Sequence, residues 1–234
     1  MSVILEARRL TKAYGNNFAL HEMNLQVEAG EIFCLLGQNG AGKTTTINLF
    51  LGFVEPTSGE AVVRDKRVHA DPHIARKYLS YIPEVVQLYA NLSGLENLDF
   101  FSRLAGFKYK QQQLAEFLTK AGLQETAFTQ NLGRYSKGMR QKVGIAIALA
   151  KNADVIFMDE PTSGLDPKAT DEFTTICKEL AQNGKTLFMA THDIFNAVST
   201  GHRIGIMKAG ALVFTTPTKG ITPAQMQQLY LETI

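Results

Sequence analysis

Short apolar runs, each bounded by glycine or by a polar turn, recur along the chain. Runs of this length and composition are typical of buried strands, and they predict strands at residues 32–36, 79–82, 154–160 and 186–190. The stretches between these runs carry helix signals instead. Strands that alternate with helices predict an α/β fold, in which a mainly parallel sheet is flanked by helices.

The two ends of the chain have a different pattern. Residues 3–8 and 24–27 are short apolar or alternating segments separated by a turn, so they predict a small antiparallel β layer ahead of the main sheet. A separate strand is predicted at residues 60–63. Near the C-terminus, residues 203–207 and 211–215 predict a hairpin. A final helix is expected to start near Pro223.

The middle of the chain is helical. Ser93 and Glu96 form a capping box, which predicts a helix that ends near Leu104. Residues 111–121 predict a second amphipathic helix, which stops at a glycine. We therefore expect residues 85–150 to form a helical subdomain inserted in the α/β core, within a single domain of residues 1–234.

Composition narrows the function classes. The 24 Lys and Arg against 22 Asp and Glu give a net charge of +2, which is too small to collect nucleic acid, so no nucleic-acid partner is expected. Only Cys34 and Cys177 are present, which favours a reducing, cytoplasmic location without disulfides. No apolar run approaches the ~20 residues that cross a bilayer, so we expect no direct membrane insertion.

Residues 37–44 read GQNGAGKT and match the phosphate-binding pattern G-x-x-x-x-G-K-[ST]. The glycines allow backbone N–H groups to surround a phosphate, and the helix that follows directs its positive end at the same anion. Lys43 would reach the β- and γ-phosphates, and the Thr44 hydroxyl would bind Mg²⁺. The alternative is an ordinary glycine-rich turn, which the strand before and the helix after the loop disfavour.

Polar residues follow two further strands. Asp159 and Glu160 come at the carboxyl end of the 154–160 run, where a carboxylate can hold Mg²⁺ through water and a second can take a proton from an attacking water. Alternatively, both are solvated acids. His192 follows the next strand, where it could bind the γ-phosphate, although a loop histidine is more often only solvated. Tyr14, before a turn, could stack on a base or simply pack.

The segment Tyr135-Ser136-Lys137-Gly138-Met139 precedes another helical run. Ser136 is a plausible N-cap, and Gly138 would let a ligand approach the first turn closely. This helix start is either a second anion site, to which Lys137 would add a cation, or a capped core helix.

The order GQNGAGKT, YIPE, YSKGM, DVIFMDE, SGLD and TH resembles the ATP-binding subunit of ABC transporters over essentially the whole chain. The resemblance implies ATP and Mg²⁺ as cofactors on a P-loop NTPase core. It implies nucleotide contacts from Tyr14, Gly37, Gln38, Asn39, Gly40, Ala41, Gly42, Lys43, Thr44 and Thr45. It implies contacts with the ATP of a second copy from Ser136, Gly138 and Asp166. It implies catalytic roles for Glu160, His192 and Lys43, and Mg²⁺ ligands at Thr44, Glu84 and Asp159.

Three positions depart from the family pattern. Glu84 stands where the family usually has glutamine, and Lys137 and Met139 replace a glycine and a glutamine. Such variants resemble the ABC-2 export type. We therefore expect an ATP-hydrolysing motor that closes as a head-to-tail dimer, with itself or a related ATPase subunit, and drives a separate integral membrane permease from the cytoplasmic face. Alternatives are a soluble ABC protein acting on ribosomes or DNA, a P-loop kinase, and a non-hydrolysing ATP switch.

Overall fold

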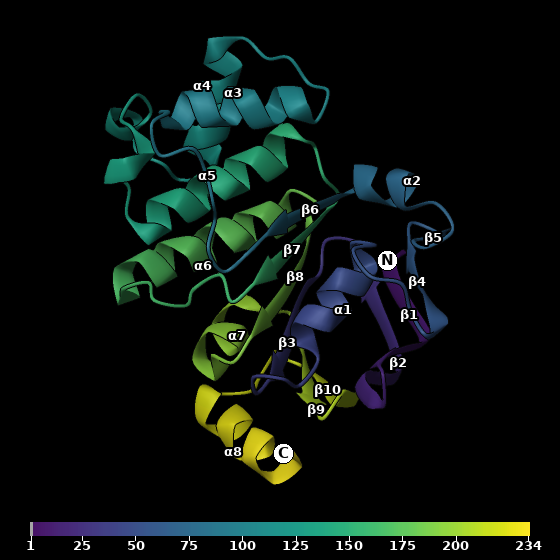
Figure 1. The fold of residues 1–234 in the computed structure, drawn as a ribbon. Coiled ribbons are helices and arrows are strands. Elements are labelled where there is room, and N and C mark those ends of the chain that lie inside the picture. The colour runs from purple at the N-terminus through teal and green to yellow at the C-terminus, as the bar shows by residue number, and fades with distance from the viewer. Residues whose placement is uncertain (1) are drawn as a thin grey trace.

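The main sheet of the computed structural model, which describes residues 2–234, has six strands in the order β10-β9-β3-β8-β7-β6 (Figure 1). Its strands are β3 (Ile32–Gly37), β6 (Leu79–Ile82), β7 (Val155–Asp159), β8 (Thr186–Thr191), β9 (Arg203–Lys208) and β10 (Ala211–Pro217). All pairs are parallel except the β9–β10 hairpin. Every residue of β3, β7 and β8 is buried, which explains why these strands read as unbroken apolar runs.

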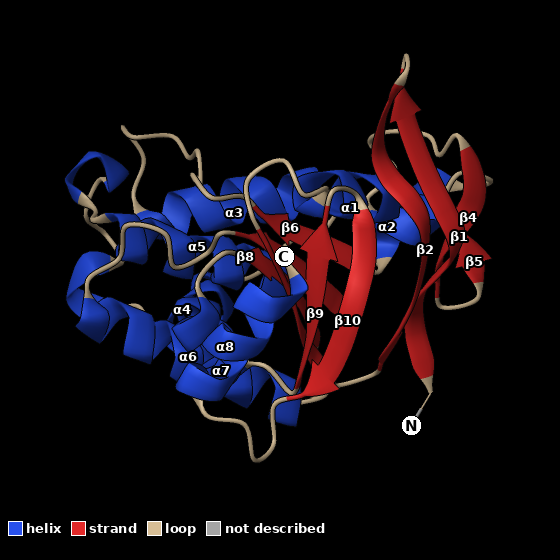
Figure 2. Ribbon diagram, turned by 90° about the horizontal axis from the view of Figure 1, so that it is seen from below, coloured by secondary structure: helices blue, strands red, loops and turns tan. Residues whose placement is uncertain are grey.

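A second, antiparallel sheet lies beside the main one, in the order β2-β1-β4-β5 (Figure 2). Its strands are β1 (Val3–Tyr14), β2 (Asn17–Glu28), β4 (Ser58–Val63) and β5 (Lys66–Arg67). The predicted β layer is confirmed, but β1 and β2 are much longer than the predicted 3–8 and 24–27. In residues 9–14 of β1 and 17–23 of β2, buried and exposed positions do not alternate regularly. The apolar pattern therefore underestimates the length of both strands.

Neighbouring residues of β3 face two different layers. Phe33 and Leu35 pack with α1 (Lys43–Phe50) and the antiparallel sheet, whereas Cys34 and Leu36 pack toward the helices on the opposite face. Those helices are α5 (Lys137–Ala150), α6 (Pro167–Gln182) and α7 (Ile194–Thr200), and α8 (Pro223–Thr233) packs on α7. Helix α2 (Pro72–Lys77) lies near β5 and β6. The sheet is therefore covered on both faces, as a parallel sheet requires.

Between β6 and β7 the chain forms α3 (Gly94–Leu104), α4 (Gln111–Lys120), two short 3₁₀ turns at 125–127 and 132–134, and α5. The Ser93–Glu96 capping box is confirmed, since Ser93 N–H donates to the Glu96 carboxylate over 2.8 Å and Ser93 Oγ accepts from Glu96 N–H. Burial varies along α3: Leu98 is fully buried, but Leu104 is 73% exposed.

The strand order decides where the polar residues meet. β8 lies between β3 and β7, and all three run parallel, so their carboxyl ends share one edge of the sheet. That edge carries Gly37, Asp159 and Thr191. Within residues 2–234, no helix combines the length and the apolar character needed to cross a bilayer.

Candidate functional site

The turn between β3 and α1 is shaped by close neighbours from other strands. Gly42, the N-cap of α1, has a φ of 105°, and a side chain there would collide with the carbonyl oxygen of Ala19. A Cβ at Gly37 would come within 2.9 Å of Met207 O. Both positions therefore require glycine, and the loop is held with the N-terminus of α1 directed into its concave side.

Lys43 lies inside this loop. Its side chain is only 6% exposed, and its Nζ donates to Gly37 O over 2.6 Å and to Gln38 O over 3.3 Å. The same Nζ lies 3.5 Å from Glu160 Oε1. The ammonium is thus held beside a carboxylate at the position where the loop can receive an anion.

Thr44 and Asp159 join the loop to the end of β7. Thr44 Oγ1 donates to Asp159 Oδ2 over 2.8 Å. Burial raises the pKa of Asp159 above its ordinary value, and this effect outweighs the hydrogen bond from Thr44, which lowers the pKa. A buried carboxylate with an elevated pKa is a group that gains from a nearby cation.

Glu160 follows β7 with a φ of 44°, a left-handed conformation that costs about 1–3 kcal/mol in a residue other than glycine. Its Oε2 accepts from Thr191 Oγ1 over 3.1 Å and lies 2.9 Å from His192 Nδ1. Its Oε1 is buried and accepts no hydrogen bond within the described residues. This side chain is 13% exposed, which disfavours the alternative of a solvated strand-end acid.

These groups surround a cavity of about 250 Å³. Its lining comprises Ala19, Gln38, Asn39, Gly40, Gly42, Lys43, Thr44, Thr45, Glu84, Asp159 and Glu160. Gly37 and Ala41 belong to the loop without lining the cavity. Tyr14 is half exposed and also lies outside the lining, with Lys12 Nζ 4.9 Å from its ring centre. Two contributors had no predicted role: Ala19, an apolar residue, and the Thr191 hydroxyl, although Thr191 belongs to the TH pair.

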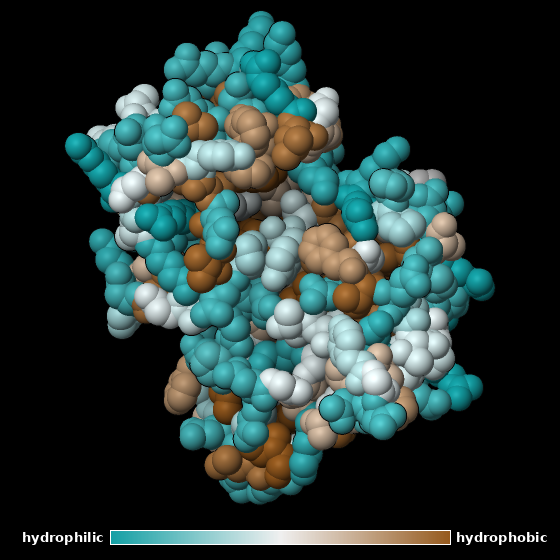
Figure 3. Space-filling model, in the orientation of Figure 1, coloured by the Kyte–Doolittle hydropathy of each residue, from teal (hydrophilic) through white to brown (hydrophobic). Residues whose placement is uncertain are grey.

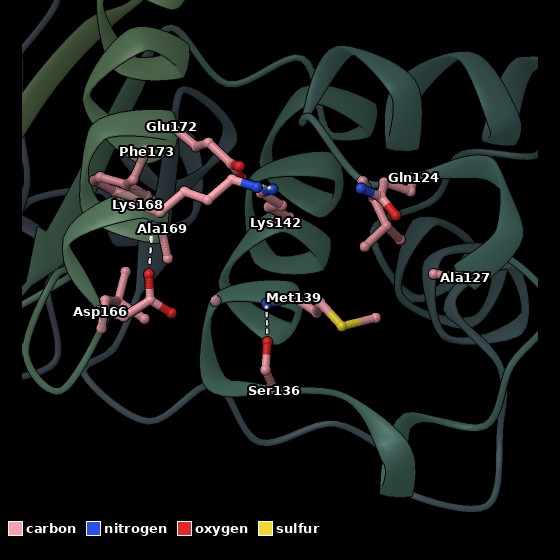
Figure 4. Close-up of a pocket in the computed structure, with 13 residues that line it drawn as sticks. Gln124, Ala127, Ser136, Met139, Lys142, Asp166, Lys168, Ala169, Glu172 and Phe173 are labelled. Carbon is pink, nitrogen blue, oxygen red and sulfur yellow. Dashed lines mark hydrogen bonds and ion pairs between the residues drawn. The ribbon is translucent and has the colours of Figure 1, made fainter.

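A separate cavity of about 230 Å³ lies between the starts of α5 and α6 and residues 123–127 (Figure 4). Ser136 Oγ accepts from Met139 N–H, and the Asp166 carboxylate accepts from Ala169 N–H, so both residues are helix N-caps. Lys142 and Glu172 join the two helices over 2.7 Å. Ser136, Gly138 and Asp166 all line this cavity, and none of the residues of the first cavity does.

The donors of the first cavity suit a hard cation. Thr44, Asp159 and Glu84 offer oxygen atoms, the ligands that Mg²⁺ prefers when phosphate oxygens complete its shell. Among residues 2–234, no group of three His, Cys, Asp or Glu side chains could bind a metal alone.

Comparisons with known proteins agree with this geometry. The family model described as ABC transporter matches residues 20–163. The bacitracin transport ATP-binding protein BcrA of Bacillus licheniformis is 34% identical over 93% of this chain and 71% of its own length. The probable multidrug ABC transporter ATP-binding protein YbhF of Escherichia coli is 34% identical over 90% of this chain, which spans only 36% of that relative.

Solved structures have the same fold. The ATP-binding cassette MJ0796, in a dimeric post-hydrolysis state bound to ADP and Pi, superposes with a TM-score of 0.81 at 29% identity. The match covers 93% of this chain and 100% of that one.

Proposed function

The chain belongs to the ABC transporter family, and from that premise we propose that it is the ATP-hydrolysing motor of a membrane exporter. Membership makes it an ATP-binding domain of the ATP hydrolase class, whose relatives form dimers. The proposal rests on one observation: apart from Tyr14, Gly37 and Ala41, the residues implied to touch nucleotide are divided between two cavities of the same chain. Neither cavity holds a whole set, so two copies are needed.

ATP would bind first at the P-loop. Gln38, Asn39, Gly40 and Gly42 line the cavity together with the first residues of α1, and their backbone N–H groups would surround the phosphates. Lys43 would exchange its contacts with Gly37 O and Gln38 O for the β- and γ-phosphates. Tyr14, with its exposed ring, would stack on the adenine. Thr44, Asp159 and Glu84 would hold Mg²⁺, which neutralises charge on the phosphate oxygens.

Hydrolysis would depend on Glu160. Its Oε2 is held by Thr191 and His192, so Oε1 is the atom left to accept a proton from a water molecule. That water attacks the γ-phosphorus, the bond to the β–γ bridging oxygen breaks, and ADP and phosphate result. His192, already in contact with Glu160, would also donate to the γ-phosphate.

The second cavity would bind the γ-phosphate held by another copy. The starts of α5 and α6 both border it, with Ser136 and Gly138 on one helix and Asp166 before the other. The N–H groups and the positive dipole end of α5 are suited to an anion. The triphosphate would hold two chains together head to tail, and its hydrolysis would release them.

The permease is proposed to dock on the hydrophobic face beside α3. Figure 3 shows apolar surface there and between α3 and α2. Phe100 and Leu104 of α3 are exposed, and so are Val85 and Tyr89 in the segment before it, where the Tyr89 ring packs on Phe100. Phe53, also exposed, lies beside Arg76 of α2. Within the helical subdomain of residues 85–150, the segment 88–104 would pass motion to this partner, at the cytoplasmic face of the membrane. Export, rather than import, is proposed from the name of one relative, the Nod factor export ATP-binding protein I of Cupriavidus metallidurans, which is 34% identical over 90% of this chain.

Glu160→Gln tests both steps. We expect ATP turnover to fall by about 10²–10⁴-fold, the usual contribution of a general base. ATP should still bind. Light scattering should detect an ATP-dependent dimer that persists, because the ATP held between the two copies is no longer hydrolysed. Glu116→Gln, an exposed change on α4, is the control and should behave as wild type. Wild-type turnover in Glu160→Gln, or a chain that stays monomeric with ATP, would reject the proposal.

A further inference from the structure

Two of the unusual residues of this chain touch each other. Glu84 lies in the loop after β6, and Lys137 is the first residue of α5. Lys137 Nζ is 3.9 Å from Glu84 Oε1, and Ser163 Oγ donates to the same oxygen over 2.9 Å. Three loops that are distant in the sequence therefore converge on one carboxylate oxygen.

One turn further along α5, Gln141 reinforces this junction. Gln141 is 1% exposed, and its Nε2 lies 3.3 Å from both Glu84 O and Pro161 O. Residues 137 and 141 lie on one face of the helix. The start of α5 thus holds both the loop that carries Glu84 and the loop that follows Glu160.

The charges of the P-loop cavity show why this contact matters. Glu84, Asp159 and Glu160 all line it, and Lys43 is the only lysine or arginine among its lining residues. A triphosphate would add more negative charge to this set. Each uncompensated like charge within a few ångströms opposes that binding.

Lys137 compensates the third carboxylate. Although it lies between Ser136 and Gly138, it does not line the second cavity. Its ammonium is directed toward Glu84 of its own chain, not toward the place where a second copy's phosphate would bind. The Lys137 ammonium, expected to add positive charge at the start of α5, therefore pairs with a carboxylate of the P-loop cavity instead.

We propose that Lys137 is a positioning residue for nucleotide binding: with Ser163, it holds and neutralises Glu84, so that the P-loop cavity can accept ATP despite its third carboxylate. The inference rests on the proposed function. The charges of Glu84 and Lys137 then offset each other. Removing one of the two charges should change ATP affinity more than removing both.

A double-mutant cycle tests this, with ATP affinity measured by titration in EDTA at low salt, so that neither Mg²⁺ nor turnover contributes. Lys137→Met should weaken ATP binding about three- to tenfold, a coupling of the size seen between contacting residues. Glu84→Gln should bind at least as tightly as wild type. Glu84→Gln/Lys137→Met should recover to within about twofold of wild type, and Lys137→Arg should retain wild-type affinity. High salt should reduce these differences.

The matched control is Lys120→Met, which removes one positive charge at the end of α4, away from the cavity. Equal affinities for Lys137→Met and Lys120→Met, or a double variant as weak as Lys137→Met, would overturn the inference. If Lys137→Met does not fold, weaker binding by Glu84→Gln than by wild type would still overturn it. If the wild-type chain fails to bind ATP even when Mg²⁺ is present, the proposed function fails instead.

Discussion

The two cavities of this chain differ in the chemistry of their linings. The P-loop cavity is formed by a backbone turn and holds three carboxylates around one lysine. The second cavity lies between two helix starts and has an apolar wall that includes Leu123 and Phe173, with Lys142 and Lys168 among its polar groups. In the proposed function, the first supplies the groups for hydrolysis, and the second adds the N-terminal N–H groups of α5 and α6 to these side chains. The comparison suggests that catalysis and association are separate properties of one chain.

Lys43→Ala should have the largest effect of the variants that distinguish the two cavities, and the effect should be on ATP affinity. The buried ammonium is the mobile cation of the P-loop cavity, and charge-assisted hydrogen bonds contribute about 1.5–3 kcal/mol each. We expect ATP affinity of the monomer to fall about 100-fold in a titration. Lys142→Ala, which removes a lysine from the second cavity, should leave monomer affinity unchanged. Equal losses in both variants would mean that the cavities do not act separately.

Gly138→Asp should separate association from binding. A Cβ at Gly138 would meet Ala169 and Leu165 at ordinary distances of 3.5 and 3.6 Å, so the fold should tolerate a side chain. An acid in the first turn of α5 favours the helix by about 0.3–1 kcal/mol but repels a phosphate. We expect unchanged ATP affinity of the monomer and ATP-dependent dimerisation about tenfold weaker, measured by light scattering in the Glu160→Gln background.

The control for this prediction is Gly138→Ala, which adds the Cβ without the charge. Its dimerisation should remain close to that of the parent variant. If alanine weakens the dimer as much as aspartate does, steric contact and not charge decides the effect.

Asp159→Asn should have the smallest effect of these variants, and the effect should be on the stability of the fold. Burial raises the pKa of Asp159 above its ordinary 3.8, so between 3.8 and the folded-state pKa the folded chain binds more protons than the unfolded chain. Stability is therefore lost as the pH rises through that window. Asparagine removes this loss, and we expect the melting temperature to rise by about 2–4 °C at neutral pH, the shift that ~1 kcal/mol gives at this size.

The pH dependence distinguishes this cause from a packing effect. The difference in melting temperature between wild type and Asp159→Asn should shrink as the pH is lowered toward 3.8. A constant difference across that range would show that burial of the charge is not responsible.

The sequence predicted the core strands and the phosphate loop because their causes are local. An unbroken apolar run must be buried on both faces, which is true of β3, β7 and β8. The glycines of residues 37–42 and the N-caps Ser93 and Ser136 follow from backbone chemistry within a few residues. α7 was not predicted, since it is short and its apolar pattern is weak.

Contacts between distant segments were decided only by the tertiary structure. Strand order places β8 between β3 and β7, and so brings His192 and Thr191 against Glu160. The sequence treated Glu84 and Lys137 as two independent departures, yet the packing of α5 against the loop after β6 makes them an ion pair. Local conformation is set by neighbours along the chain, whereas the pairing of charges depends on which segments the core brings together.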